Sequence, residues 1–239
     1  MAQKISQKKQ SGRQAIVALI TEGAETTGAS GGATALTKGT FYTVIEKKSG
    51  SVLPAAEGHQ FLATSALTLV EGERVLALSD PWSKEAFLGF ANSKSYDENK
   101  NSYDQTDDWD DEADNGVEDL TNRTGSISGV ALNDAPEGCP YDLIMSEFQH
   151  TVDQNAVQTA NQELEPDAPV HLVAYIDNKN APAAGDKVDI KFFPLRFTSH
   201  GESSSYGGVS TCQFGWSGAS VTAKGSKATR LKTTIPSTT

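Results

Sequence analysis

The chain has 239 residues and carries 31 acidic against 20 basic side chains, a formal net charge of −11. Proteins that coat DNA or RNA need a basic face, so this charge argues against that class. The apolar content of 37% with 21 glycines is that of an ordinary soluble domain, and the longest apolar run, residues 15–20, is much shorter than a membrane-spanning helix, so we expect no membrane partner.

The N-terminal segment, residues 1–35, is predicted to be an extended arm. It is polar and rich in small residues, and it has too few large apolar side chains to form a core. Its basic residues are Lys4, Lys8, Lys9 and Arg13. No acid precedes Glu22, so this end of the chain is positively charged although the whole chain is acidic.

The next part of the chain is predicted to be β-structure. Residues 41–46 are aromatic and β-branched, as is typical of a strand. Residues 61–70 and 74–78 flank a short turn that contains a glycine and are predicted to form a hairpin. Residues 87–96 and 126–132 lie on either side of an acidic stretch, and if these two strands pair, the stretch becomes a long hairpin loop.

The acidic stretch, residues 97–119, has eleven acids and one base, a local net charge of −10. Loops of this length in compact domains are usually functional or disordered. Trp109 is a large aromatic residue among these acids, and such a side chain is typical of a contact that another surface receives. We therefore predict a docking loop.

One helix and three strands are predicted after this stretch. The helix begins at Pro140 and has an apolar face of Tyr141, Ile144, Met145, Phe148 and Val152. Residues 170–176 and 188–192 follow as paired strands, with Pro194 at an edge or a bulge because proline cannot donate to the ladder. Residues 209–216 form the last strand.

The C-terminal residues 222–239 are predicted to be a tail. They hold Lys224, Lys227, Arg230 and Lys232, and no acid follows Glu202. A chain that is basic at both ends and acidic in the middle is suited to self-association or to a charged partner.

Chemistry-bearing motifs are sparse in this sequence. Cys139 and Cys212 lie too far apart for a metal-ligand spacing, and the four histidines are scattered singly. We therefore expect no catalytic, cofactor or metal site, and no enzymatic activity. An enzyme with a serine or histidine site is the third-ranked hypothesis.

A calcium-stabilised surface or adhesion β-sandwich is the alternative hypothesis, with Ca²⁺ bound through the stretch from Asp104 to Asp119. Clustered carboxylates suit this hard cation. The spacing is not that of an EF-hand, because Gly116 comes one residue late and Thr121 occupies the position of the closing glutamate.

Several segments together resemble the major tail tube proteins of tailed bacteriophages, over about residues 36–221. The similarity lies in the order of a small-residue arm, the run Leu36–Val44, a strand into Ser95-Tyr96-Asp97, the acidic loop, the run Thr124–Gly129, the amphipathic helix and a final hairpin that ends in Gly215-Trp216-Ser217-Gly218. It is a similarity of architecture, and no single motif is diagnostic.

The resemblance implies a mainly β fold, a β-sandwich or half-barrel of tail-tube type with one flanking α-helix, a long acidic hairpin loop and an extended N-terminal arm. Six copies would form a ring, and stacked rings would form a hollow tube with an electronegative bore through which double-stranded DNA passes without specific binding. Tape-measure and tail-terminator proteins are the expected partners, and the protein would be synthesised and assembled in the host cytoplasm and located in the virion.

The resemblance and the charge pattern together predict the contacts between subunits. The acidic loop would contact the neighbouring ring, and both basic termini would clasp adjacent subunits. The predicted interface residues are Asp104, Asp107, Asp108, Trp109, Asp110, Asp111, Glu112, Asp114, Lys4, Lys8, Lys9, Arg13, Lys224, Lys227, Arg230 and Lys232.

Overall fold

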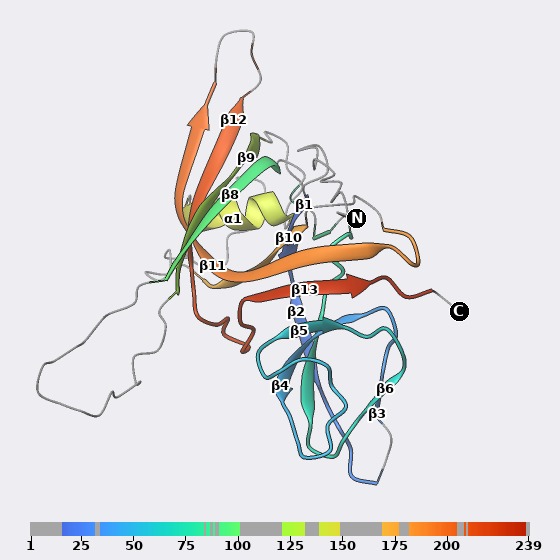
Figure 1. Cartoon of the computed structure of the whole chain (residues 1–239). Coiled ribbons are helices and arrows are strands. Elements are labelled where there is room, and N and C mark those ends of the chain that lie inside the picture. The colour runs from blue at the N-terminus through green and yellow to red at the C-terminus, as the bar shows by residue number, and fades with distance from the viewer. Residues whose placement is uncertain are drawn as a thin grey trace, which may run out of the picture.

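The computed structural model describes residues 16–31, 34–83, 85–86, 88, 91–100, 121–131, 139–148, 169–176, 182–204, 208 and 210–237. In this part of the chain the protein is mainly β, with one helix and a large sheet that curls into a half-barrel (Figure 1). The expectation of a mainly β fold with one flanking helix is therefore confirmed.

The large sheet has seven strands. Its spatial order is β1 (Ile16–Ile20), β10 (His171–Ile176), β11 (Lys187–Ser203), β12 (Thr211–Gly218), β9 (Thr121–Val130) and β8 (Ala91–Lys100), with β13 (Thr229–Thr234) also paired to β11. All of these pairs are antiparallel. A second sheet is formed by β2 (Glu22–Thr27), β7 (Arg74–Leu78), β4 (Phe41–Glu46) and β5 (Gln60–Leu62), and β3 (Thr34–Leu36) pairs with β6 (Leu67–Leu69).

Residues 192–195 of β11 are buried on both faces of the sheet. Val188, Ile190 and Phe192 point to one side, where they pack with apolar residues of the second sheet. Phe193 and Leu195 point to the other side, into a core enclosed by the curl of the large sheet. Because successive side chains of a strand alternate between its faces, this one strand contributes to two cores.

Pro194 marks the place where β11 changes neighbours. On one edge, β11 pairs with β13 up to Phe192 and with β12 from Leu195 onward. The Pro194 carbonyl accepts a hydrogen bond from the Ala219 amide on this edge, at 2.8 Å. The missing N–H of proline therefore falls in the gap between two partner strands, where no ladder bond is needed.

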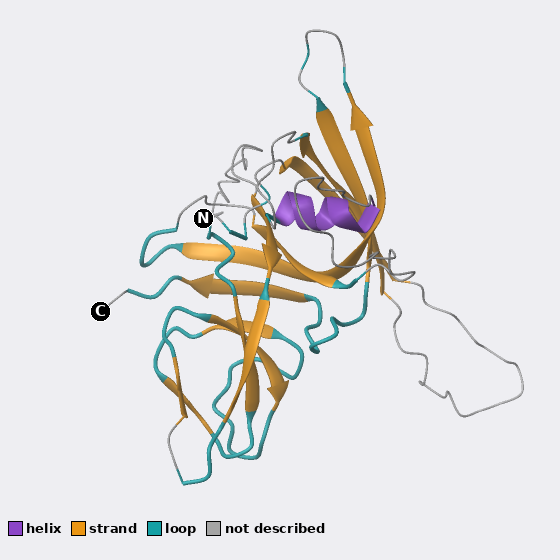
Figure 2. Cartoon of the chain, turned by 180° about the vertical axis from the view of Figure 1, so that it is seen from behind, coloured by secondary structure: helices purple, strands orange, loops and turns teal. Residues whose placement is uncertain are grey.

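The helix α1 (Pro140–Phe148) lies within the curl of the large sheet (Figure 2). Cys139 caps its N-terminus, since its carbonyl accepts the Leu143 amide at 2.9 Å. Tyr141 and Ile144 are buried in the core, and Met145 and Phe148 pack against it as well. The predicted apolar face is confirmed for these four residues, while Val152 lies outside the described residues.

Trp216 and Tyr175 connect strands β12 and β10 of the large sheet through a side-chain contact inside this core. The Trp216 indole donates a hydrogen bond to the Tyr175 hydroxyl at 2.8 Å, and both side chains are almost fully buried. Burial raises the pKa of Tyr175, so its hydroxyl stays protonated at neutral pH. The polar atoms of both rings are thus satisfied inside the core.

The prediction that residues 1–35 form an arm outside the core is wrong for residues 16–31. Strand β1 pairs with β10, and Val17, Ala18, Leu19 and Ile20 are all buried. Strand β2 follows and pairs with β7. A short strand that is covered on both faces has no alternation of apolar and polar residues, so its pattern resembles a simple apolar run.

The expectation of a C-terminal tail over residues 222–239 is also wrong for most of that segment. Strand β13 pairs with β11 along its whole length. Before it, Thr222 and Ser226 are buried, and the Thr222 hydroxyl donates a hydrogen bond to the Glu22 carboxylate at 2.7 Å. The segment therefore connects the two sheets.

The predicted hairpin around residues 71–73 is present only as a turn. Gly72 has the positive φ of 76° that the turn requires, and the Glu73 amide donates to the Val70 carbonyl at 3.0 Å. The strands on either side separate, however: β6 pairs with β3, and β7 pairs with β2 and β4. By contrast, the predicted pairing of the strands around the acidic stretch is observed between β8 and β9.

We expect Ile144→Ala to lower the free energy of unfolding of the isolated subunit by about 2 to 5 kcal/mol, because Ile144 is fully buried between helix and sheet. Leu143→Ala is the matched control on the same helix. Leu143 is 46% exposed, so its truncation should change stability by about 0.5 kcal/mol or less. Denaturant unfolding checks both, and equal effects would show that the helix does not pack as described.

Candidate assembly surface

The second half of the large sheet has an outer face of small polar side chains. It comprises β8, β9, β12 and the part of β11 after Pro194. We name its outer side the hydroxyl face, and its described side chains are Ser93, Ser95, Asp97, Thr124, Ser126, Ser128, Val130, Arg196, Ser199, Gly201, Ser203, Thr211, Gln213, Gly215 and Ser217. Asp97 and Arg196 are the charged residues among them.

The alternation of residues along these strands produces the hydroxyl face. On β12, Cys212, Phe214 and Trp216 are buried in the core, and the residues between them point outward. The register pairs Phe214 with the buried Ile127 of β9 and Gln213 with the outward Ser128. Buried apolar and outward polar residues therefore alternate along β12 and its partner residues in β9.

Hydroxyl groups on this face bond to one another across the strands. The Ser93 and Ser128 hydroxyls lie 2.6 Å apart, and those of Ser95 and Ser126 lie 3.0 Å apart. Each pair sits at directly opposed positions of β8 and β9. Such cross-strand pairs stabilise the sheet and satisfy part of the hydrogen-bonding capacity of the serines.

Gly125 permits β8, β9 and β12 to approach closely. A Cβ atom at this position would lie 2.3 Å from the Ser95 carbonyl oxygen and 2.5 Å from the Trp216 ring. The Trp216 ring therefore lies directly against Gly125, and a side chain here would displace either the β8 backbone or Trp216.

Both borders of this four-stranded part have unpaired backbone edges in the described structure. Ahead of β8, the Leu88 amide donates to Val17 of β1 at 2.9 Å, but no described strand pairs with the outer edge of β8 itself. On the other side, β10 pairs with β11 up to Leu195, and no described strand continues along residues 196–203. Unpaired strand edges are templates for the addition of another strand.

The two edges are complementary in direction. Each neighbouring pair in the order β11-β12-β9-β8 is antiparallel, so β8 runs opposite to β11. In a ring whose axis runs along these strands, rotation leaves the strand direction unchanged, and β8 of one copy therefore meets β11 of the next copy as an antiparallel pair. The second half of the sheet can thus continue from copy to copy without a change of pairing type.

Of the predicted interface residues, the C-terminal bases lie in the described part of the chain. The Lys224 ammonium donates to the carbonyl of Gly23 at 3.2 Å, and the Lys227 amide donates to the carbonyl of Gly58 at 2.7 Å. Arg230 forms an ion pair with Asp189 at 2.6 Å. Three of these bases thus have contacts within their own subunit.

Lys232 is exposed on β13, opposite Asp189. The other predicted interface residues lie outside the described residues, and these are Lys4, Lys8, Lys9, Arg13, Asp104, Asp107, Asp108, Trp109, Asp110, Asp111, Glu112 and Asp114. The hydroxyl face was not predicted from the sequence. Its signal is the alternation of serine with glycine and isoleucine at residues 125–129.

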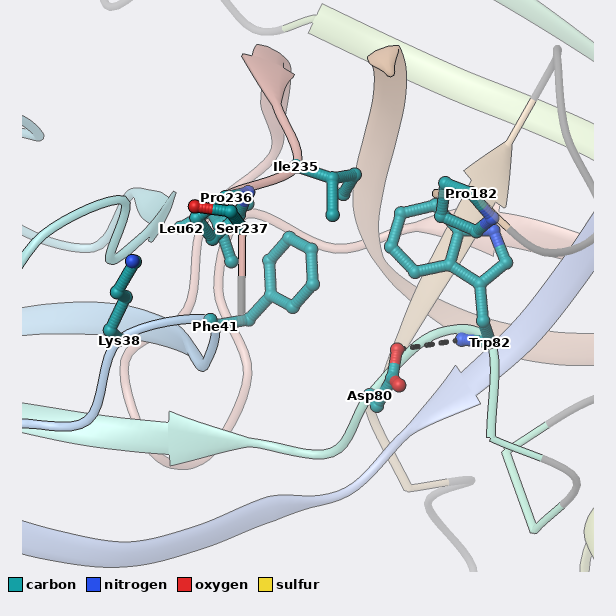
Figure 3. A pocket seen from close by; sticks show the side chains of 10 residues that line it. Lys38, Phe41, Leu62, Asp80, Trp82, Pro182, Ile235, Pro236 and Ser237 are labelled. Atoms are coloured by element: carbon teal, nitrogen blue, oxygen red, sulfur yellow. Dashed lines mark hydrogen bonds between the residues drawn. The ribbon is translucent and has the colours of Figure 1, made fainter. Parts of the chain in front are cut away.

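A pocket of about 510 Å³ lies between the second sheet and the C-terminal segment (Figure 3). Phe41, Trp82 and Ile235 line it with apolar surface, while Lys38 and Asp80 are among its polar residues. The Asp80 carboxylate accepts the Trp82 backbone amide at 3.0 Å. This arrangement can receive an apolar side chain.

The free thiol of Cys212 is buried beneath the hydroxyl face. Burial, together with the charge of Glu202, raises the pKa of Cys212 to about 11. The thiol is therefore protonated and weakly nucleophilic at neutral pH. Cys139 is also a free thiol.

Comparison with protein-family models, with curated proteins and with solved structures found no match. Within the described part of the chain, no three histidine, cysteine or acidic side chains are grouped to hold a metal ion. The stretch from Asp104 to Asp119, on which the calcium hypothesis depends, lies outside the described residues. No helix among the described residues is long and apolar enough to cross a membrane.

We expect Gly125→Ala to destabilise the subunit by about 1 to 3 kcal/mol, because the added methyl overlaps the Ser95 carbonyl and the Trp216 ring. Gly201→Ala is the control, since a Cβ atom at Gly201 meets nothing within 4 Å. This control should stay within about 1 kcal/mol of the parent protein. Thermal unfolding followed by tryptophan fluorescence measures both, and a neutral Gly125→Ala would refute the close packing.

Proposed function

We propose that this protein is a structural virion subunit that assembles into stacked hexameric rings, which form the hollow tail tube of a bacteriophage. The observation that carries the proposal is the four-stranded part of the large sheet, which has an unpaired edge on each side. The hexamer and the phage tail come from the resemblance in the sequence. The edges supply the means of self-assembly.

Ring closure in this proposal occurs by strand addition. Strand β8 of each subunit pairs with residues 196–203 of β11 in the next subunit, and the pairing direction is antiparallel at every junction. A backbone hydrogen bond contributes about 0.5 to 1.5 kcal/mol net, so a ladder along the ten-residue β8 stabilises each junction by several kcal/mol. A closed ring also leaves none of these edges open to aggregation.

The hydroxyl face then lines the bore. Specific or tight binding to DNA phosphates requires several lysine or arginine side chains. Arg196 is the base among the described side chains of this face, and Asp97 balances its charge. A wall of serine and threonine hydroxyls, four of which are bonded in two cross-strand pairs, gives DNA few charged groups to hold it. Double-stranded DNA would pass through the lumen without specific binding.

The remaining assignments follow from the same proposal. The protein acts mechanically and has no enzymatic activity or cofactor. Tape-measure and tail-terminator proteins are its partners besides further copies of itself, and it has no membrane partner. Its location is the phage tail in the virion, after assembly in the host cytoplasm.

Negative-stain electron microscopy of the purified protein tests the assembly. Rings or tubes with a central hole support the proposal, and monodisperse single subunits at every concentration refute it. Calorimetric titration with Ca²⁺ discriminates the adhesion hypothesis, which requires site-like binding. The tube proposal requires no calcium.

We predict that assembly protects backbone amides of β8 and of residues 196–203 from hydrogen exchange. In the isolated subunit, the amides on the outer edge of each strand face solvent, whereas a neighbouring strand would bond them in the ring. Mass spectrometry of assembled and unassembled protein measures this protection. Strand β10, which is paired on both edges, is the internal control. Rings with unprotected edges would show that closure uses another surface.

A further inference from the structure

We propose that β11 and β13 form a basic docking surface for residues 101–120 of a neighbouring copy of this chain. The proposal rests on the self-assembly proposed above and identifies one contact within it. It is carried by the register of two strands, by the charge on one sheet face and by the placement of the β8–β9 hairpin.

The register brings four bases together. Lys187 is opposite Thr234, Asp189 is opposite Lys232, and Lys191 is opposite Arg230. Residues that are directly opposed in an antiparallel pair lie on the same face of the sheet. We call this group, Lys187, Lys191, Arg230 and Lys232, the basic ladder.

The ladder lies on a solvent-accessible part of the sheet. Lys187, Arg230 and Lys232 are exposed, and Lys191 is partly exposed. The Lys191 ammonium lies 5.2 Å from the centre of the Tyr96 ring, so the ladder is on the same side of β11 as the core within the curl. The basic ladder therefore reaches β8 at Lys191.

The ladder has an excess of positive charge. Where β11 and β13 pair, along residues 187–192 and 229–234, Asp189 is the acid on this face, and Arg230 binds it through two nitrogens. Four bases against one acid leave a net charge of +3 on a protein whose formal net charge is −11. Such a reversal of local charge is suited to an acidic partner, since opposite potentials favour association.

Residues 101–120 are a partner of the required chemistry. They contain nine acids and no base, together with Trp109. This segment carries nine negative charges, whereas the C-terminal residues after Glu202 carry four bases and no acid. The ladder selects Arg230 and Lys232 from that C-terminal set and adds Lys187 and Lys191, which the sequence pattern did not single out.

The placement of the strands favours a neighbouring copy as the partner of Lys187 and Lys232, at the end of the ladder farther from β8. Residues 101–120 connect the end of β8 to the start of β9. In both views this end of the β8–β9 hairpin and the C-terminal end of β13 lie on opposite sides of the molecule (Figures 1 and 2). Two copies that face each other through these ends bring the acids of one to the bases of the other.

The test reverses the charge at the exposed end of the ladder. We expect Lys187→Glu with Lys232→Glu to raise the critical concentration for assembly about tenfold at about 0.1 M salt, and we expect this rise to disappear near 1 M, where the screening length falls to about 3 Å. Lys38→Glu with Lys48→Glu is the control, because it makes the same change in net charge in the loops on either side of β4. This control should shift the critical concentration less than about twofold at either salt level. Adding Asp110→Lys and Asp111→Lys to the ladder variant should restore assembly toward that of the parent protein.

Carbodiimide cross-linking of a mixture of ¹⁵N-labelled and unlabelled protein identifies the occupant. Cross-links between ladder lysines and acids of residues 101–120 that join a labelled to an unlabelled chain support the proposal. Cross-links confined to one chain overturn it, as does their complete absence. Tubes with an unchanged critical concentration in the ladder variant would overturn this inference and leave the tube proposal intact, whereas mixed cross-links without rings would support the contact and refute the tube.

Discussion

The structure depends on the requirement that β11 serve two cores at once. Val188, Ile190 and Phe192 pack in the core shared with the second sheet, and Phe193, Leu195 and Phe197 pack in the core within the curled half-barrel, while the residues after Phe197 are polar or glycine and mostly exposed. Pro194 lies in this strand at the position where a missing amide costs no ladder bond. One continuous strand therefore fixes the buried layer relative to the four strands with open edges, and the hydroxyl face is the outward side of this arrangement.

Local patterns in the sequence were sufficient to predict the elements whose residue spacing or composition is typical of a helix or a strand by itself. The helix was predictable because Tyr141 and Ile144 recur at helical spacing, and β4 because its residues favour strands. Strands β1 and β13 were missed for opposite reasons. The first is buried on both faces and lacks alternation, whereas the second alternates but carries Arg230 and Lys232 on an exposed face. In both cases the strand is defined by a distant partner that a local window does not contain.

The basic ladder was predictable from the sequence only as part of a segregation of charge along the chain. The sequence showed that bases and acids are segregated, yet it did not show which bases share a surface, since Lys187 and Lys232 become neighbours through the register of β11 with β13. The ion pair of Arg230 with Asp189 likewise needs the fold. The edges of the four-stranded part have no local signature at all, because an open edge is a property of the strand order. The resemblance to phage tail tube proteins suggested a hexameric ring. The strand order leaves open edges on β8 and β11, which are compatible with such a ring.

Some contacts of this fold join segments from near the two ends of the chain, and they determine when during synthesis a subunit can complete its folding. Strand β1 pairs with β10, and the Thr222 hydroxyl reaches the Glu22 carboxylate across 200 positions of sequence. Contacts of such long range form slowly, because the intervening chain must first be confined. During synthesis, the N-terminal strands must wait until nearly the whole polypeptide has left the ribosome. In the proposed assembly, the sheet edges are thus presented by finished chains, because a nascent chain has no complete sheet to which a neighbour could add a strand.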